Sequence, residues 1–275
     1  MIARIVGATL STQLGQQVVI DNRGGAGGVV ATETLARSVP DGHTLGVVYT
    51  PHTNQPAFQK LPYDPVKDFT PLTMMTAAPL VLVVHPGLPA KSVKELIALA
   101  KTKPIVYGSA GTGSGGHLSG ELLKLMAGID ATHVPYKGAA PAATDLIGGQ
   151  LHFQFAAQIT IGAFVKSGRL RALAVTSIKR ATTLPDLPTV AESGVPGFEV
   201  INWFGIMGPA RLPSALVERL HSEITMALRA PEVRDKLLAQ GSELIGNTPQ
   251  EFAQFLRNDI AKWAKLVKAS AIKLD

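Results

Sequence analysis

Apolar positions change their spacing several times along the chain, and each change marks an expected element. Helical spacing predicts helices over 2–14, 29–38, 92–101, 117–127, 141–147, 160–167, 214–230, 231–240 and 248–269. Short β-branched or apolar runs predict strands over 17–20, 44–49, 80–84, 105–107, 132–134, 151–155 and 170–176. Start and stop residues support these bounds: Gly15 ends the first helix, and capping boxes open the helices after Ser92 and Thr248. Residues 51–71 are proline-rich and are expected to be irregular.

The alternation of strands and helices through the middle of the chain predicts the fold class. It is typical of an α/β protein with parallel sheets and helices on both faces. A length of 275 residues exceeds what one core usually needs, so two domains are expected. Ligands of such sheets bind beyond the carboxyl ends of the strands. Loops rich in glycine or hydroxyl groups follow predicted strands at 22–28, 50–54, 109–116 and 136–140.

Residues 105–118, IVYGSAGTGSGGHL, form the most informative of these loops. The pattern predicts a strand, a tight polar turn and a helix. Glycine lets the backbone take positive φ and approach a ligand closely, and the unpaired N–H groups of the first helical turn favour anions. Hydroxyl groups of Ser109, Thr112 and Ser114 add donors, whereas His117 either caps the backbone or touches the ligand. The loop therefore predicts a carboxylate, phosphate or sulfate site.

Composition narrows the function classes. Hydrophobic residues make up 46% and charged residues 17% of the chain, which is typical of a packed domain rather than a disordered one. The net charge of +6 is scattered, so we expect no nucleic-acid partner. The absence of cysteine excludes disulfides and thiolate chemistry and is compatible with either the periplasm or the cytosol. No apolar run approaches the ~20 residues of a membrane span.

Enzyme motifs are incomplete. Gly111-x-Gly113-x-x-Gly116 matches the letters of a dinucleotide fingerprint, but the acidic residue expected about 20 residues later is missing. Neither Ser109 nor Ser114 has glycine at both the −2 and +2 positions, as a nucleophile elbow requires. The seven histidines show no metal-ligand spacing, and His133 and His152 are expected to be structural. We expect no cofactor and no metal, and a nucleotide-dependent α/β enzyme using this loop stays open as the alternative.

A series of segments carries a resemblance to a known family. They are VIDNRGGAGG at 19–28, PDGHTL at 40–45, LPYDPVKDF at 61–69, YGSAGTGSGGHL at 107–118, HVPYKG at 133–138, GGQ at 148–150 and RALAVTS at 171–177. In this order they resemble the solute-binding receptors of the tripartite tricarboxylate transporters, also called the Bug receptor family. The resemblance runs from about residue 2 to 267.

The resemblance implies a periplasmic receptor with the two-lobed, type II periplasmic-binding-protein (Venus-flytrap) architecture. Residues 1–84 with 206–275 would form the first lobe and residues 85–205 the second. Such a receptor captures a small carboxylate between its lobes and delivers it to the membrane permease subunits of the transporter, without catalysis. We expect a monomer whose partners are this ligand and that permease.

The family pattern also implies the ligand site, residue by residue. The second lobe would contribute Ser109, Ala110, Thr112, Gly113, Ser114 and His117, with Tyr136, Lys137, Gly138 and Ala139 beside them. Thr50, His52 and Thr53 would come from the first lobe. Many members carry an aspartate where this chain has Ala156, which argues for a plain carboxylate, such as a dicarboxylate, over an amino acid, because an unpaired ammonium is costly to desolvate. Gln158 would hydrogen-bond the ligand.

Family receptors carry further segments before the part that matches Ile2: a signal peptide, an apolar strand and a glycine-proline loop. This sequence shows none of them, so we expect a fold without the first strand of lobe 1. Loss of a central strand exposes hydrogen-bonding edges. A truncated remnant that binds nothing is therefore a further alternative.

Overall fold

The chain divides into two compact units. The structure, a computed structural model, describes residues 2–25, 28–239 and 241–270. Unit 1 comprises residues up to Ala77 together with Trp203–Lys265, and unit 2 comprises Ala78–Asn202 together with the residues from Leu266. The lobe bounds near residues 84 and 206 stay a prediction. Among the described residues, no helix is both long and apolar enough to cross a membrane.

Unit 1 is built from helices around a small antiparallel sheet. Its helices are α1 (Ile2–Leu14), α2 (Val29–Ala36), α3 (Pro51–Asn54), a 3-10 turn (Gln55–Ala57), α8 (Ser214–Arg229), α9 (Pro231–Leu238) and most of α10 (Pro249–Ser270). Its strands are β1 (Gly46–Tyr49), the first part of β2 (Phe69–Val84), most of β7 (Ile201–Pro209) and β8 (Glu243–Leu244). β1 pairs antiparallel with β7, β7 neighbours β2, and β8 pairs antiparallel with β2. Val6 and Leu10 of α1 pack in the core with Ile224 of α8 and Leu237 of α9.

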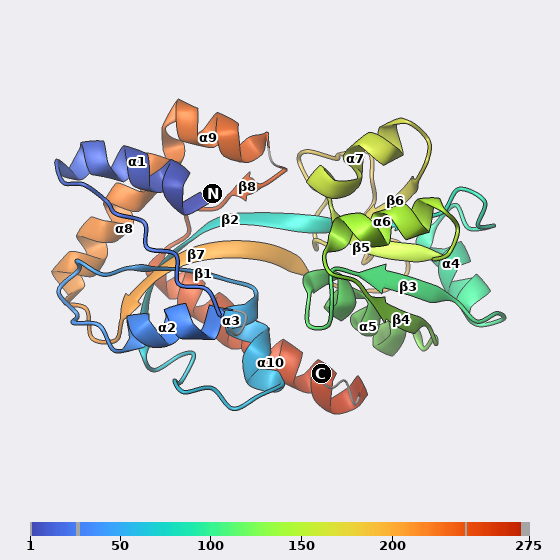
Figure 1. Cartoon of the computed structure of the whole chain (residues 1–275), viewed down its shortest axis with the longest axis horizontal. Coiled ribbons are helices and arrows are strands. Elements are labelled where there is room, and N and C mark those ends of the chain that lie inside the picture. Colours follow the sequence, from blue (N-terminus) through green and yellow to red (C-terminus); the bar gives the residue numbers. More distant parts are fainter. Residues whose placement is uncertain (1, 26–27, 240, 271–275) are drawn as a thin grey trace. The chain divides into compact units, whose positions relative to one another are not determined.

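Unit 2 is a mixed sheet covered on both faces. Its strands are the end of β2, β3 (Val106–Ser109), β4 (Thr132–Pro135), β5 (Phe153–Ala157) and β6 (Arg171–Val175). Its helices are α4 (Val93–Ala100), α5 (Gly115–Ala127), α6 (Ala139–Ile147) and α7 (Gln158–Lys166). Figure 1 shows α6 and α7 on one side of β3 and β5 and α5 on the other. The side chains of β5 alternate accordingly, because Phe153 stacks on Tyr107 of β3 whereas Ala156 joins Leu146 of α6 and Ile161 of α7 in a second core.

The expectation of parallel sheets holds only within part of unit 2. β3 pairs parallel with β4 and with β5, as strands joined by crossover helices do. β2 pairs antiparallel with β5 and with β6, and in unit 1 β1 pairs antiparallel with β7. The sheets expected to be parallel are therefore mixed, because the long β2 and the late strand β7 join them from distant parts of the chain.

One local prediction is also wrong, and one strand is not predicted. Residues 17–20 form no strand: the Val18 N–H donates to the Ser11 hydroxyl (2.9 Å) instead of a neighbouring strand. Strand β7 was not predicted, because Gly205 and Gly208 interrupt its apolar pattern. These glycines are places of close packing, since a Cβ at Gly205 would lie 2.2 Å from the ring of Phe252.

Helix starts follow the sequence closely. α1 has the predicted bounds, Ile2–Leu14, and Gly15 after it has φ +64°. At the start of α4, the Ser92 hydroxyl accepts the Glu95 N–H (3.2 Å). At α10, Thr248 and Glu251 form the full reciprocal box, because the Glu251 carboxylate also accepts the Thr248 N–H (2.9 Å).

Candidate anion site in unit 2

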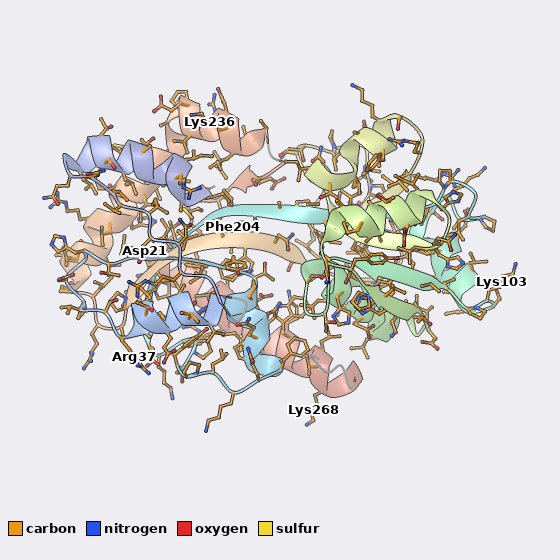
Figure 2. The ribbon with its side chains drawn as sticks, in the orientation of Figure 1. Asp21, Arg37, Lys103, Phe204, Lys236 and Lys268 are labelled. Carbon is orange, nitrogen blue, oxygen red and sulfur yellow. The ribbon has the colours of Figure 1, made fainter. Side chains whose placement is uncertain are left out.

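The predicted strand, glycine turn and helix are present. β3 ends at Ser109, which is fully buried, and α5 begins at Gly115. Gly111 and Gly113 between them have φ +123° and +77°, conformations that favour glycine. Lys103, labelled in Figure 2, precedes β3 and marks the opposite end of the strand from this turn. We call residues 109–117 the anion loop.

Side chains of the anion loop mostly hold the loop itself. The Gly111 N–H donates to the Ser109 hydroxyl (3.1 Å). The Ser114 hydroxyl caps α5 by accepting the His117 N–H (3.3 Å), and His117 Nδ1 in turn accepts the Gly113 N–H (3.0 Å). Ser114 and His117 resemble a capping box, except that the histidine accepts the N–H of Gly113, one residue before the N-cap. These bonds fix the directions of the remaining amides.

Several N–H and hydroxyl groups of the anion loop have no hydrogen-bond partner among the described residues. Across the described ranges 2–25, 28–239 and 241–270, the N–H groups of Ala110, Thr112, Gly115 and Gly116 have no acceptor, nor does the Thr112 hydroxyl have a partner. Gly115 and Gly116 are the first residues of α5, where the helix dipole adds partial positive charge. This arrangement is suited to an oxyanion.

A second helix starts beside the first. β4 runs parallel to β3, so the turn at 136–138 leaves the same end of the sheet as the anion loop. The two turns are bonded: the Tyr136 N–H donates to the Ser109 carbonyl (3.1 Å) and the Gly138 N–H to the Ala110 carbonyl (3.3 Å). α6 begins at Ala139 after Gly138, which has no side chain to cap it. A second set of helix N-terminal amides therefore lies next to the first.

The surroundings of this second turn are polar. The Tyr136 hydroxyl donates to the Asp145 carboxylate (2.6 Å), and burial together with this bond raises the pKa of Tyr136 to about 12. The buried Gln154 donates its amide N–H to the Ala139 carbonyl (3.1 Å) and so holds the first residue of α6. Lys137 is exposed and adds positive charge near the turn.

A residue that the sequence analysis did not single out also lies at the start of α5. A Cβ at Gly115 would be 2.7 Å from the side-chain oxygen of Asn202, so this carboxamide packs against the first residue of the helix. Asn202 belongs to β7, a strand that the sequence does not predict. No motif or residue spacing in the sequence identifies Asn202 as a residue of the site. Only the tertiary structure brings it to the loop.

The predicted residues of unit 1 are buried among partners of their own. His52 Nε2 lies 2.8 Å from the Pro65 carbonyl and its ring contacts Tyr63 and Phe69. Burial lowers the pKa of His52 to about 4, so the ring is neutral and donates from Nε2. The Thr53 hydroxyl donates to the Asp259 carboxylate of α10 (2.6 Å).

Thr50 has only a weak bond of this kind, because its hydroxyl accepts the Trp203 N–H at 3.5 Å. All three predicted residues of unit 1 are less than a tenth exposed. They hold α3 in place in this structure, and a role in ligand binding stays a prediction.

Ala156 and Gln158 lie near each other along the chain but differ in surroundings. Ala156 is buried in the apolar core of unit 2 with Val81 and Ile161. Gln158 is the first residue of α7, and within the described part of the chain its side chain has no hydrogen-bond partner. Among the described residues, no group of three or more His, Asp or Glu side chains is placed to hold a metal ion.

Comparisons with known proteins agree with the sequence resemblance. A family model described as "Tripartite tricarboxylate transporter family receptor" matches residues 2–272. Protein BugT of Bordetella pertussis is 35% identical over 279 residues, covering 100% of this chain and 86% of BugT.

Solved structures extend the likeness to the fold. A structure of an R. palustris protein with adipate is 37% identical with a TM-score of 0.82, covering 100% of this chain and 93% of that one. MatC from Rhodopseudomonas palustris with bound malate is 31% identical with a TM-score of 0.75, covering 97% and 93%. The chain therefore has the α/β periplasmic-binding-protein fold of these structures, as the sequence predicts.

Proposed function

The chain belongs to the tripartite tricarboxylate transporter receptor family, a family of binding proteins and not of enzymes, and on this premise we propose that it is an extracytoplasmic receptor for a small dicarboxylate. Family membership confirms the predicted family and the prediction that the protein is not an enzyme. It also removes the nucleotide-dependent enzyme as a competing function for the glycine loop.

One observation of the structure carries the proposal. Two helix N-termini, those of α5 and α6, start side by side at the ends of the parallel strands β3 and β4. Their turns are joined by backbone bonds, and the anion loop keeps four N–H groups without an acceptor among the described residues. A carboxylate matches this set of donors in charge and in hydrogen-bonding capacity.

Two further facts support a dicarboxylate. The relatives described above were solved with adipate and with malate, both dicarboxylates. In this chain Ala156 offers no carboxylate where many family members have an aspartate, and its surroundings are apolar. An amino dicarboxylate would leave its ammonium unpaired there, at a desolvation cost of several kcal/mol.

The residues have different parts in this proposal. The Thr112 hydroxyl and the open amides contact the ligand, whereas Ser109, Ser114 and His117 hold the anion loop in shape. Lys137 attracts the anion. Delivery of the ligand to a membrane permease and a periplasmic location are part of the same proposal, since the transporter family implies both.

A ligand panel measured by calorimetry and thermal shift tests the proposal. Adipate, succinate and malate are expected to raise the melting temperature of the folded chain, since a ligand at about 100 times its Kd stabilises by about 2.7 kcal/mol. Hexanoate is the matched control, because it has the length of adipate but only one carboxylate, and it is expected to bind at least tenfold more weakly. Aspartate and glutamate test the role of Ala156 and are expected to bind weakly.

Three other results would contradict the proposal or part of it. A folded sample stabilised by no acid would refute the receptor function and favour the non-binding remnant. Equal affinity for adipate and hexanoate would leave a carboxylate receptor but remove the dicarboxylate. Stabilisation by NADH instead of acids would contradict the proposal and support a nucleotide site at Gly111–Gly116.

A further inference from the structure

The last residue of the anion loop, His117, stacks on a second histidine. The rings of His117 on α5 and His133 on β4 have centroids 4.0 Å apart and an interplanar angle of 19°. His117 Nδ1 accepts the Gly113 N–H (3.0 Å), whereas His133 Nε2 lies 2.7 Å from the Ser109 hydroxyl. One histidine therefore holds the end of the loop and the other holds its beginning, and the stack joins them.

The bond from Gly113 fixes the protonation state of His117. Only a nitrogen without a proton can accept an N–H, so Nδ1 is bare and the neutral ring carries its proton on Nε2. A proton on Nδ1 would place two donors against each other and release the Gly113 amide. Gly113 lies between Thr112 and the cap residue Ser114, so its release would turn the amides assigned to the ligand.

The ionisable groups that face this pair, among the described residues, come from α5 and β3. The Glu121 carboxylate, one turn beyond His117, is buried and accepts from the Tyr107 hydroxyl (2.8 Å) and from Lys124 Nζ (2.9 Å). Glu121 favours a charged His117 and Lys124 opposes it, but burial is the largest cause and lowers the pKa of His117. Burial, and then the neighbouring His117, lower the pKa of His133 to about 4.

We propose that His133 is a positioning residue for the anion loop: it packs on His117 and binds Ser109, so that a neutral His117 holds the Gly113 amide. This inference rests on the proposed function for its ligand, but the geometry belongs to the protein without ligand. The expected effect of histidine protonation on anion binding is opposite to the usual one. A cationic histidine near an anion site ordinarily strengthens binding, whereas protonation of this pair opens the loop and weakens it.

Nuclear magnetic resonance on the unliganded chain tests the geometry directly. Histidine nitrogen shifts are expected to show His117 with its proton on Nε2 at about pH 7.5. On acidification, the Gly113 amide signal is expected to move together with the titration of His117, at a midpoint below the ordinary value of about 6.5. His133→Gln keeps a polar group near Ser109 but removes the ring, and it is expected to raise that midpoint by about half a unit or more.

His152 provides the matched control. Its Nδ1 also accepts a backbone N–H, that of Val106 (3.0 Å), but at the other end of β3. His152→Asn is expected to leave unchanged the pH midpoint at which the Gly113 amide signal moves. A His117 protonated on Nδ1 at neutral pH, a Gly113 signal that stays still while His117 titrates, or an unchanged midpoint in His133→Gln would each overturn the inference.

Calorimetry with adipate then gives the binding consequence. Between about pH 7.5 and pH 5.5, His133→Gln is expected to lose up to about threefold more affinity than the unmodified chain and His152→Asn, since a half-unit shift changes the ratio of protonated to neutral His117 by about threefold. Protonation of adipate is common to all three proteins and cancels in the ratio. A ratio in the opposite direction overturns the inference and leaves the receptor function standing. If adipate, succinate and malate all fail to bind, the receptor function is refuted. The pH dependence of the Gly113 amide signal then still tests whether His133 positions the loop.

Discussion

Thr53 in unit 1 and Thr112 in unit 2 show how differently two similar residues are used. Both come soon after a strand, Thr53 in the short helix α3 and Thr112 in the anion loop, and the sequence predicts that both contact the ligand. The Thr53 hydroxyl is fully buried and donates to Asp259 (2.6 Å). Thr112 is half-buried, and its hydroxyl has no partner within the described residues.

The difference comes from the backbone at the end of each strand. After β1 the chain turns at once into α3, and His52 packs against Tyr63 and Phe69, so the polar groups face partners inside unit 1. After β3 the positive φ angles of Gly111 and Gly113 delay the helix until Gly115. Between strand and helix, the N–H groups of Ala110 and Thr112 therefore have no acceptor among the described residues. Here the backbone conformation, more than the side-chain type, determines whether a threonine hydroxyl bonds within the protein, as in Thr53, or is left without a protein partner, as in Thr112.

The largest expected effect of breaking this arrangement comes from Gly116→Ala in unit 2. A Cβ at Gly116 would lie 2.6 Å from the Phe155 carbonyl oxygen, which belongs to the backbone of β5 and cannot move aside. α5 must shift, and its open amides shift with it. We expect a loss of about 3 kcal/mol in unfolding free energy, at the upper end of overpacking costs, and loss of adipate binding. Urea unfolding and calorimetry measure both.

Gly162→Ala in α7 is the matched control. It is also a helical glycine of unit 2, but the nearest atom to its Cβ would be Gln158 Cγ at 3.9 Å. Alanine there is expected to be neutral or to stabilise by up to about 1 kcal/mol, because it favours the helix. Equal effects of the two substitutions would show that α5 does not pack closely on β5.

Local signals explain what the sequence could predict. The bounds of α1 and the capping boxes of α4 and α10 depend on residues within one turn, and all are present. The strand, glycine turn and helix around residues 109–117 were predictable for the same reason, since their conformation depends on glycines within nine residues of each other. The strand expected at 17–20 failed because a strand needs a partner, and the residues there find none to pair with among the described strands.

The roles of side chains were less predictable, because their partners are distant in sequence. Asp259, which binds the Thr53 hydroxyl, is 206 residues away, and no spacing rule connects the two. The sequence predicts a structural role for His133, but its stacking on His117 depends on the pairing of β3 with β4. Asn202 lies at the start of α5 but belongs to β7. The sequence does not predict this strand, because Gly205 and Gly208 interrupt its apolar pattern.

A smaller effect is expected from Thr53→Val in unit 1. Valine keeps the shape but removes the donor to a buried carboxylate, and a hydrogen bond to a charged group contributes about 1.5–3 kcal/mol. Asp259 keeps its bond from Trp263 Nε1 (3.0 Å), so we expect a loss near 2 kcal/mol in unfolding free energy. Urea unfolding measures it.

Thr34→Val is the control for that substitution. The Thr34 hydroxyl is exposed and bonds the Val30 carbonyl of its own helix (2.9 Å), so its removal is expected to change stability by less than about 0.5 kcal/mol. If Thr53→Val weakens adipate binding by more than it weakens folding, Thr53 is a ligand residue after all, and the contrast between the two units disappears.

The smallest effect is expected from Thr112→Val, and it sharpens the comparison most. Because the Thr112 hydroxyl has no protein partner among the described residues, its loss is expected to change unfolding free energy by less than about 0.5 kcal/mol. Adipate binding is expected to weaken by about 1 kcal/mol, or roughly fivefold, through loss of one hydrogen bond. Calorimetry and urea unfolding on the same sample separate the two quantities.

Ser114→Ala gives the reference for a residue that shapes the loop. It removes the cap of α5, so we expect about 1 kcal/mol lower stability together with weaker binding. Thr112→Val should therefore lower affinity without lowering stability, whereas Ser114→Ala lowers both. The same pattern in both variants would place the Thr112 hydroxyl among the groups that hold the loop, and only the backbone amides would then remain to bind the carboxylate.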